Sequence, residues 1–422
     1  MSGRDLSIRI AASPVPLPVL TYTLARVRAV LDLTSQLQTS EFPQPYCEEG
    51  IHLIATEFRQ RKELIEKFTD ETDPEIVHAA CQDLLNTLFE LLPILGFFLR
   101  STNVRNAFEL HAPLARLAKK LVSDVKLVLS SEWDFSPFTY HQMVSLPRYV
   151  LIGLPASESA NGLALPLAGH ELGHAVWAQE GLDREFNLKI ATALVSEIQS
   201  RWNEYHLHFS QVSLEALEDL SGYRTWQPAY RWATSQAQEC FCDQFGVRVF
   251  GESYLHAFAY LLAPGLPARN PAYPSNRRRA ENLVEACKRW GLSVPGNYVG
   301  NFRDGTSRLE GSVEFLCSVA DRAVDALAGD LLERCHQISK EAEVPLQDEQ
   351  EITKIVEAFR KLVPGTEAKS LCSITNAGWR AFHDPTFWSN YAHIRERKPV
   401  VLNELLLKTV EVFEVEAKLK EE

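Results

Sequence analysis

The chain has 422 residues, of which 45% are hydrophobic and 23% charged, a composition that excludes a disordered or fibrous protein. Its formal net charge of −12 argues against nucleic acid as the main partner, because binding to phosphates requires a basic surface. The eight cysteines have no framework spacing and the N-terminus has no continuous apolar leader segment. We therefore expect reduced thiols and a soluble, cytoplasmic protein.

The first third of the chain has the periodicity of amphipathic helices, with apolar residues between Leu20 and Leu31 at steps of three and four. Asp73-Pro74-Glu75 is a helix-start signal ahead of a long apolar stripe. Residues 106–129 are also predicted to be helical. The most apolar run, 84–100, falls short of the roughly 18 residues of a membrane span and is interrupted by a glutamate and a proline, so we expect a core helix there.

The pattern changes near Ser136, where aromatic and β-branched residues alternate with prolines. We predict a strand at Tyr149–Leu154, and Pro147 just before it indicates an edge position in a sheet. Helical patterns resume near Leu165 and dominate the rest of the chain. The expected fold is mainly α, and its three regions are a helical N-terminal region 1–135, a central core 136–295 with a small edge-stranded β element, and a helical C-terminal region 296–422.

The stretch "GHELGHA" has two histidines four residues apart and a glutamate directly after the first. Residues i and i+4 of a helix lie on the same face, so His170 and His174 can direct two imidazole nitrogens at one metal ion. Glu171 projects from an adjacent face, where it can hydrogen-bond a water on the metal. The alternative is a pair of hydrogen-bonded core histidines. Apolar flanking sequence disfavours it, because burying these three polar groups without partners is costly.

A catalytic zinc site has three protein ligands and one open position. Trp177 and Glu180 stand where the metzincin pattern has a glycine and a third histidine, which excludes that pattern. Glu239 and Asp243 form an E-x-x-x-D pattern on one face of an apolar helix. Glu239 is the predicted third ligand, with Glu197 in reserve, and Asp243 is the carboxylate that orients a ligand histidine.

These motifs resemble those of the gluzincin metallopeptidases, and in particular the group that contains the CAAX prenyl endopeptidases and heat-shock membrane proteases. That group continues with a histidine, a proline, and an arginine six residues after the histidine, and it lays substrate along an edge strand that precedes the metal-binding helix. Tyr273, Pro274, Ser275 and Arg279 occupy the corresponding positions here. Tyrosine replaces the family histidine, and the membrane helices of that group are missing.

The resemblance covers about residues 145–285 and implies a zincin-like catalytic core that holds one Zn²⁺ per chain. It implies an endopeptidase in which Glu171 takes a proton from the attacking water and delivers it to the leaving amine. Tyr273 or Arg279 would stabilise the oxyanion of the reaction. Arg279 stands in a run of three arginines, so a surface charge on a helix is the alternative for that residue.

Two other functions remain open: a zinc amidohydrolase of small peptides or non-peptide amides, and a non-catalytic helical interaction protein with a relic site. The presence of Glu171, which has no ligand role, disfavours a relic. We expect a protein or peptide substrate of narrow or regulated choice, and a regulatory protein partner that controls access. We expect no nucleic-acid partner and no integral membrane span.

Overall fold

The computed structural model describes residues 18–69, 71–102, 108–134, 136–265, 268–304, 309–389, 391, 394 and 397–421. These residues form fourteen α-helices and one three-stranded sheet, so the predicted mainly α fold with a small β element is confirmed. The chain divides into two compact units, Met1–Thr102 with Val144–Pro147 and Asn103–Met143 with Arg148–Glu422. This division does not coincide with the boundaries expected after residues 135 and 295.

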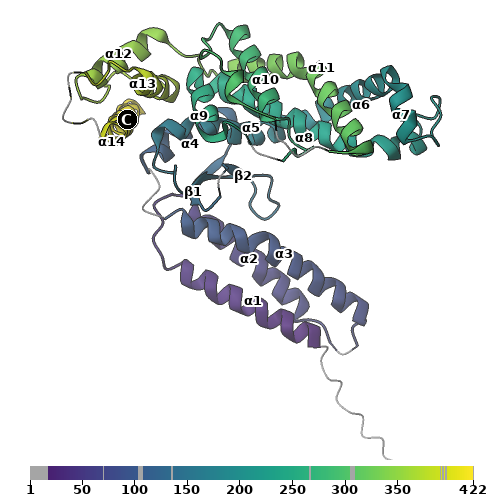
Figure 1. The fold of residues 1–422 in the computed structure, drawn as a ribbon. Helices are drawn as coiled ribbons and strands as arrows, with labels where there is room; N and C mark the ends of the chain where they lie inside the picture. The colour runs from purple at the N-terminus through teal and green to yellow at the C-terminus, as the bar shows by residue number, and fades with distance from the viewer. Residues whose placement is uncertain are drawn as a thin grey trace, which may run out of the picture. The chain divides into compact units, whose positions relative to one another are not determined.

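The first unit is built from three helices that pack on one another (Figure 1), α1 (Pro18–Leu37), α2 (Cys47–Ile65) and α3 (Pro74–Arg100). The predicted start of α3 is confirmed, because the Asp73 side chain accepts a hydrogen bond from the amide of Glu75. Among the described helices, α3 alone is long and apolar enough to cross a membrane, and 44% of its most apolar window is buried. Core helices of soluble proteins share that length and composition.

The sheet belongs to the second unit and has the strand order β1-β3-β2. The predicted strand is present as β3 (Tyr149–Pro155), but it is the central strand, with β1 (Lys126–Glu132) parallel on one side and β2 (Phe138–Tyr140) antiparallel on the other. The expected edge position is therefore wrong for this strand. Pro147 precedes the first paired residue, so its missing N–H does not interrupt the ladder.

The helix expected over residues 106–129 is wrong at its C-terminal end, because residues 126–129 belong to the strand β1. The structure ends that helix, α4 (His111–Leu121), five residues earlier. A short run of leucine and valine fits a buried strand as well as a helix, and periodicity alone does not separate the two. Residues 103–107, the last two of which belong to the expected helix, lie outside the described residues.

The centre of the second unit is α8 (Leu220–Phe250), which packs against α5 (Ala168–Gln179), α6 (Leu182–Ser200), α10 (Asn276–Trp290) and α11 (Gly311–Glu341). Every residue from Glu239 to Phe250 is buried, as expected for a helix that is covered on all sides. In Figure 1 the C-terminal helices gather at one end of this unit and α6 and α7 at the other. The remaining elements are η1 (Phe108–Leu110), η2 (Gly162–Leu167), α7 (Trp202–His208), α9 (Glu252–Leu262), η3 (Val299–Asn301), α12 (Glu349–Arg360), α13 (Leu371–His383) and α14 (Lys398–Glu421).

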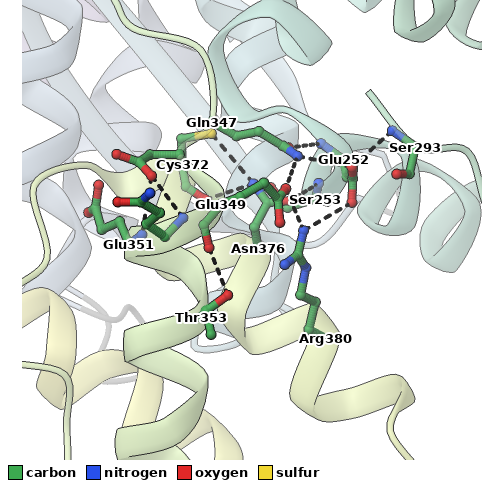
Figure 2. A network of polar contacts seen from close by, with 12 residues as sticks. Glu252, Ser253, Ser293, Gln347, Glu349, Glu351, Thr353, Cys372, Asn376 and Arg380 are labelled. Atoms are coloured by element: carbon green, nitrogen blue, oxygen red, sulfur yellow. Dashed lines mark hydrogen bonds and ion pairs between the residues drawn. The ribbon is translucent and has the colours of Figure 1, made fainter. Parts of the chain in front are cut away.

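A buried polar network joins the end of α8 to α13, and Figure 2 shows how its side chains converge on the α8–α9 junction. The Asn376 side chain donates to the carbonyl of Phe250 at 2.8 Å and accepts from the amide of Ser253 at 2.8 Å. The amide of Glu252 donates to Gln347 Oε1 at 3.0 Å. These contacts connect the C-terminal helices to α8, the helix that carries the predicted metal ligand Glu239.

Candidate metal centre

The two histidines and Glu171 lie in the first two turns of α5. The helix follows η2, whose start is capped by the Asn161 side chain on the amide of Leu163. Every residue from Ala168 to Gly173 is buried. His170 and His174 lie on one face of α5, with their ring centroids 4.9 Å apart.

Glycines allow α5 and α8 to approach closely enough for their polar side chains to meet. A Cβ atom added at Gly173 would lie 2.9 Å from Cα of Cys242, and one at Gly169 would lie 3.1 Å from Cα of Gly246. The first distance is shorter than real Cβ atoms show and the second is tighter than most of their contacts, so a larger residue at Gly173 would force the helices to shift. Gly169 and Gly173 of the GHELGHA stretch thus keep the two helices close at their crossing.

At this crossing both histidines face the carboxylate of Glu239. His170 Nε2 lies 3.3 Å from Glu239 Oε2, and His174 Nε2 lies 3.6 Å from Glu239 Oε1. Ligand atoms about 2.0–2.1 Å from a tetrahedral zinc ion are roughly 3.3 Å apart from one another. The three side chains thus have the spacing of a metal-binding set.

A second possible ligand set has the same two histidines with Cys242 in place of Glu239. The ligand atoms of these three residues lie within 4.8 Å of one another. The geometry favours Glu239, because its oxygens are closer to both imidazoles and its side chain lines the cavity, whereas Cys242 is fully buried and does not. Burial, followed by the nearby Glu239, raises the pKa of the Cys242 thiol well above its usual range, which opposes the thiolate form that a metal requires.

The outer nitrogen of His170 is fixed by Asp243. Nδ1 lies 2.9 Å from Asp243 Oδ1, so this nitrogen donates its proton and Nε2 is left to face Glu239. Asp243 in turn accepts hydrogen bonds from the Tyr254 hydroxyl at 2.8 Å and from two nitrogens of Arg279, at 2.7 and 2.8 Å. The planar fork of the guanidinium matches the carboxylate, which holds Asp243 in one orientation.

The charges of this cluster favour a cation at the inner nitrogen of His170. Burial opposes a charge on His170, but its hydrogen bonds to Asp243 and Glu239 outweigh burial and raise its pKa to about 10. Burial and the charge of His170 lower the pKa of His174 to about 3, so this imidazole is neutral and one of its two ring nitrogens has a free lone pair. With Arg279 neutralising Asp243, the carboxylates of Glu239 and Glu171 are left to balance a divalent cation.

Glu171 is 4% exposed and receives no hydrogen bond from the described residues. Burial raises its pKa to about 7. A buried carboxylate without donors is unfavourable for stability, and a raised pKa of this size is typical of groups that exchange protons in a reaction. Glu171 also lines the cavity described next, where a small molecule can reach it.

A cavity of about 610 Å³ opens over the two histidines, and the segment around β2 forms part of its wall. Tyr273 lines this cavity and is 45% exposed. The proximity of Glu239, followed by burial, raises the pKa of Tyr273, so its hydroxyl keeps the proton. Glu197, the reserve ligand, lies on α6 and pairs with Arg322 at 3.2 Å instead of lining the cavity.

Two residues of the site have no motif in the sequence. Tyr254 contacts Asp243 from the first turn of α9, and the ring occupies the space beside Gly246, where an added Cβ would lie 2.4 Å from it. A glycine inside an apolar helix is the only signal that something packs there. His141 lines the cavity next to β2, and its ring stacks on His174 at 6.0 Å. No sequence pattern around His141 distinguishes it from the other histidines of the chain.

Comparisons with known proteins add nothing to this geometry. A scan against protein-family models, a search of curated proteins and a search of solved structures found no significant match to the chain.

Proposed function

We propose that this chain is a zinc-dependent metallopeptidase, an endopeptidase that hydrolyses peptide bonds in a narrow or regulated set of protein substrates. One observation carries the proposal: two histidines, a carboxylate at ligand spacing and a buried carboxylate without hydrogen-bond donors meet at the wall of one cavity. This combination does not stabilise a protein core, because burying each of these polar groups costs free energy.

The donor set supports zinc as the metal. His170, His174 and Glu239 would hold the ion, and two imidazoles with one glutamate are a known ligand set of catalytic zinc. When bound, zinc acts as a Lewis acid that polarises a carbonyl and makes water more acidic. Asp243 orients His170 for this role, and Arg279 and Tyr254 orient Asp243.

Glu171 is the base of the proposed reaction. Its carboxylate accepts one proton from a water molecule while the water oxygen forms a bond to the carbonyl carbon of the substrate. The C–N bond then breaks, and the proton held by Glu171 passes to the amine nitrogen that leaves. The products are a carboxylic acid, which then loses its remaining proton to solvent, and a free amine, and Glu171 is ionised again.

The role of Arg279 is proposed here to be different from oxyanion stabilisation. Two of its nitrogens donate to Asp243, and it is 9% exposed, so it acts as a positioning residue behind His170. Tyr273 is partly exposed at the cavity and keeps its hydroxyl proton, which suits a donor to the substrate. A catalytic role of Tyr273 stays a prediction.

A polypeptide substrate is favoured over a small amide by the position of β2. In the sheet formed by the described residues β2 is an outermost strand, and Ser136–Thr139 and His141 line the cavity. An extended peptide can add to the outermost strand of a sheet through main-chain hydrogen bonds. A small amide lacks the extended main chain that pairs with a strand.

The test combines metal analysis with a change of the proposed base. The purified chain should contain one zinc per molecule, the Glu171→Gln variant should keep it, and His170→Ala should lose it. Hydrolysis of a mixture of internally quenched peptides should fall about 10²–10⁴-fold in Glu171→Gln. A chain without stoichiometric zinc would contradict the metallopeptidase.

Protein termini separate an endopeptidase from an amidohydrolase. Cells that produce the wild-type chain should contain new protein N-termini that are missing from cells with Glu171→Gln. An identical set of termini, together with zinc binding, would leave the amidohydrolase of small substrates. The Glu171→Gln variant can also be used to capture bound substrates, because it keeps the site but lacks the base.

A further inference from the structure

His141 is the histidine at the cavity that neither the metal set nor the proposed base uses. It follows β2 directly, lines the cavity and stacks on His174, with ring centroids 6.0 Å apart and an angle of 19° between the rings. Its Nδ1 atom is buried and has no hydrogen-bond partner in the described part of the chain. Thr139 Oγ1, on the same stretch, is also buried without a partner and also lines the cavity.

The unpaired Nδ1 decides which hydrogen-bonding group His141 presents. A neutral imidazole donates at one nitrogen and accepts at the other. A buried N–H without an acceptor is rarer in proteins than an acceptor without a donor, so the proton belongs on Nε2 and the lone pair on Nδ1. The ring therefore offers an Nε2–H donor, and no described residue accepts a hydrogen bond from it.

The other candidate donors of the site leave this role open. Arg279 lines the cavity, but its Nε and Nη2 donate to Asp243. Tyr273 reaches the cavity from the loop before α10, whereas His141 stands on the β2 segment beside the ligand His174. A substrate laid along β2 would bring its scissile carbonyl to that side of the cavity.

We propose that His141 is a catalytic residue of the peptidase proposed above, on which this inference rests. Its Nε2–H donates a hydrogen bond to the carbonyl oxygen of the scissile peptide bond while negative charge develops on that oxygen. Donors that are fixed before the reaction and aimed at a developing oxyanion contribute large rate effects. The ring of His141 lies nearly parallel to that of His174, a contact that does not use its donor.

The experiment compares two small ligands on the zinc-loaded, full-length chain. N-phosphoryl-Leu-Trp carries a tetrahedral phosphorus with charged oxygens that imitate the oxyanion, whereas the dipeptide Leu-Trp does not. His141→Phe keeps a ring against His174 and removes the donor, and His141→Gln keeps a donor. His206→Phe is the matched control, because His206 is exposed and stacks on Trp202 at 5.6 Å in α7.

We expect His141→Phe to bind N-phosphoryl-Leu-Trp about 100-fold more weakly than the wild type, with Leu-Trp affinity changed by less than about threefold. His141→Gln should recover part of the loss, and His206→Phe should bind both ligands like the wild type. Zinc content should be the same in all variants, and a melting temperature near that of the wild type shows that His141→Phe is folded.

Two results would overturn the inference about His141 alone, and a third would overturn the proposed function as well. If His141→Phe binds the phosphoryl dipeptide as tightly as the wild type, His141 is not an oxyanion donor. If His141→Phe loses zinc while His141→Gln keeps it, the imidazole supports the metal set and not the substrate. A wild-type chain that holds no zinc overturns the proposed function and this inference with it, so the two failures are distinguishable.

Discussion

Two buried polar clusters lie at opposite ends of the same buried segment of α8, and they differ in how completely they are paired. The cluster at the C-terminal end, around Asn376, uses its side chains to satisfy the backbone groups of Phe250 and Ser253. The cluster at the N-terminal end, around Glu239, contains a carboxylate without donors and a histidine with an unpaired nitrogen. The second cluster faces the cavity of about 610 Å³.

The difference indicates what each cluster does. Paired polar groups in a core stabilise one arrangement of helices, because their alternatives leave buried groups unsatisfied. Unpaired groups beside a cavity reduce stability unless a ligand completes them. The Asn376 cluster is therefore structural, whereas the Glu239 cluster has the properties of a binding site.

The largest effect on stability is expected for Asp243→Asn at the metal centre. This change removes the anion that neutralises the buried Arg279, and breaking one side of a buried ion pair costs about 3–5 kcal/mol. Chemical denaturation should show the loss of unfolding free energy. In the double variant Asp243→Asn with Arg279→Met most of that loss should be recovered; if it is not, the pair is not the cause.

The next largest effect separates the two metal-binding sets. Glu239→Gln should weaken zinc binding by more than about 100-fold, because even outer partners of ligands contribute 10–100-fold. Cys242→Ala should leave the affinity within about threefold of the wild type. Competition with a chromogenic chelator measures both. The reverse pattern would assign the third ligand to Cys242.

Asn376→Ala tests the cluster at the other end of the segment. It leaves the amide of Ser253 without its acceptor and removes one of two donors from the carbonyl of Phe250, which the Ser253 hydroxyl still contacts, so the free energy of unfolding should fall by about 1–3 kcal/mol. Zinc affinity should be unchanged, since no atom of this cluster contacts the histidines. A matched loss of zinc affinity would contradict the division into a structural and a binding cluster.

The smallest effect is expected for Tyr254→Phe, which removes one hydroxyl from Asp243 and keeps the ring beside Gly246. One hydrogen bond to a carboxylate is worth about 1.5–3 kcal/mol, and Arg279 still holds Asp243, so we expect a loss near 1 kcal/mol. Zinc affinity should fall several-fold, and the visible spectrum of the cobalt-substituted chain should shift. An unchanged spectrum would restrict Tyr254 to packing.

The parts of the site that were predictable from the sequence are those with a helical period. His170 and His174 are one turn apart, and so are Glu239 and Asp243, which is enough to place each pair on one face of a helix. Tyr254 and His141 were not predictable, because their roles depend on segments that meet only in the folded chain. The edge position of the Tyr149 strand was wrong for the same reason: strand order is a long-range property.

The sequence by itself determined that the chain is mainly helical and that α5 and α8 carry polar residues their apolar surroundings do not explain. Both follow from local spacing and composition, which act within a few residues. The tertiary structure decided that Gly173 and Gly169 let the two helices touch, and that Arg279 serves Asp243. It also decided that a cavity opens beside the β2 segment. These depend on packing between segments that are far apart in the sequence, and local patterns carry no information about such contacts.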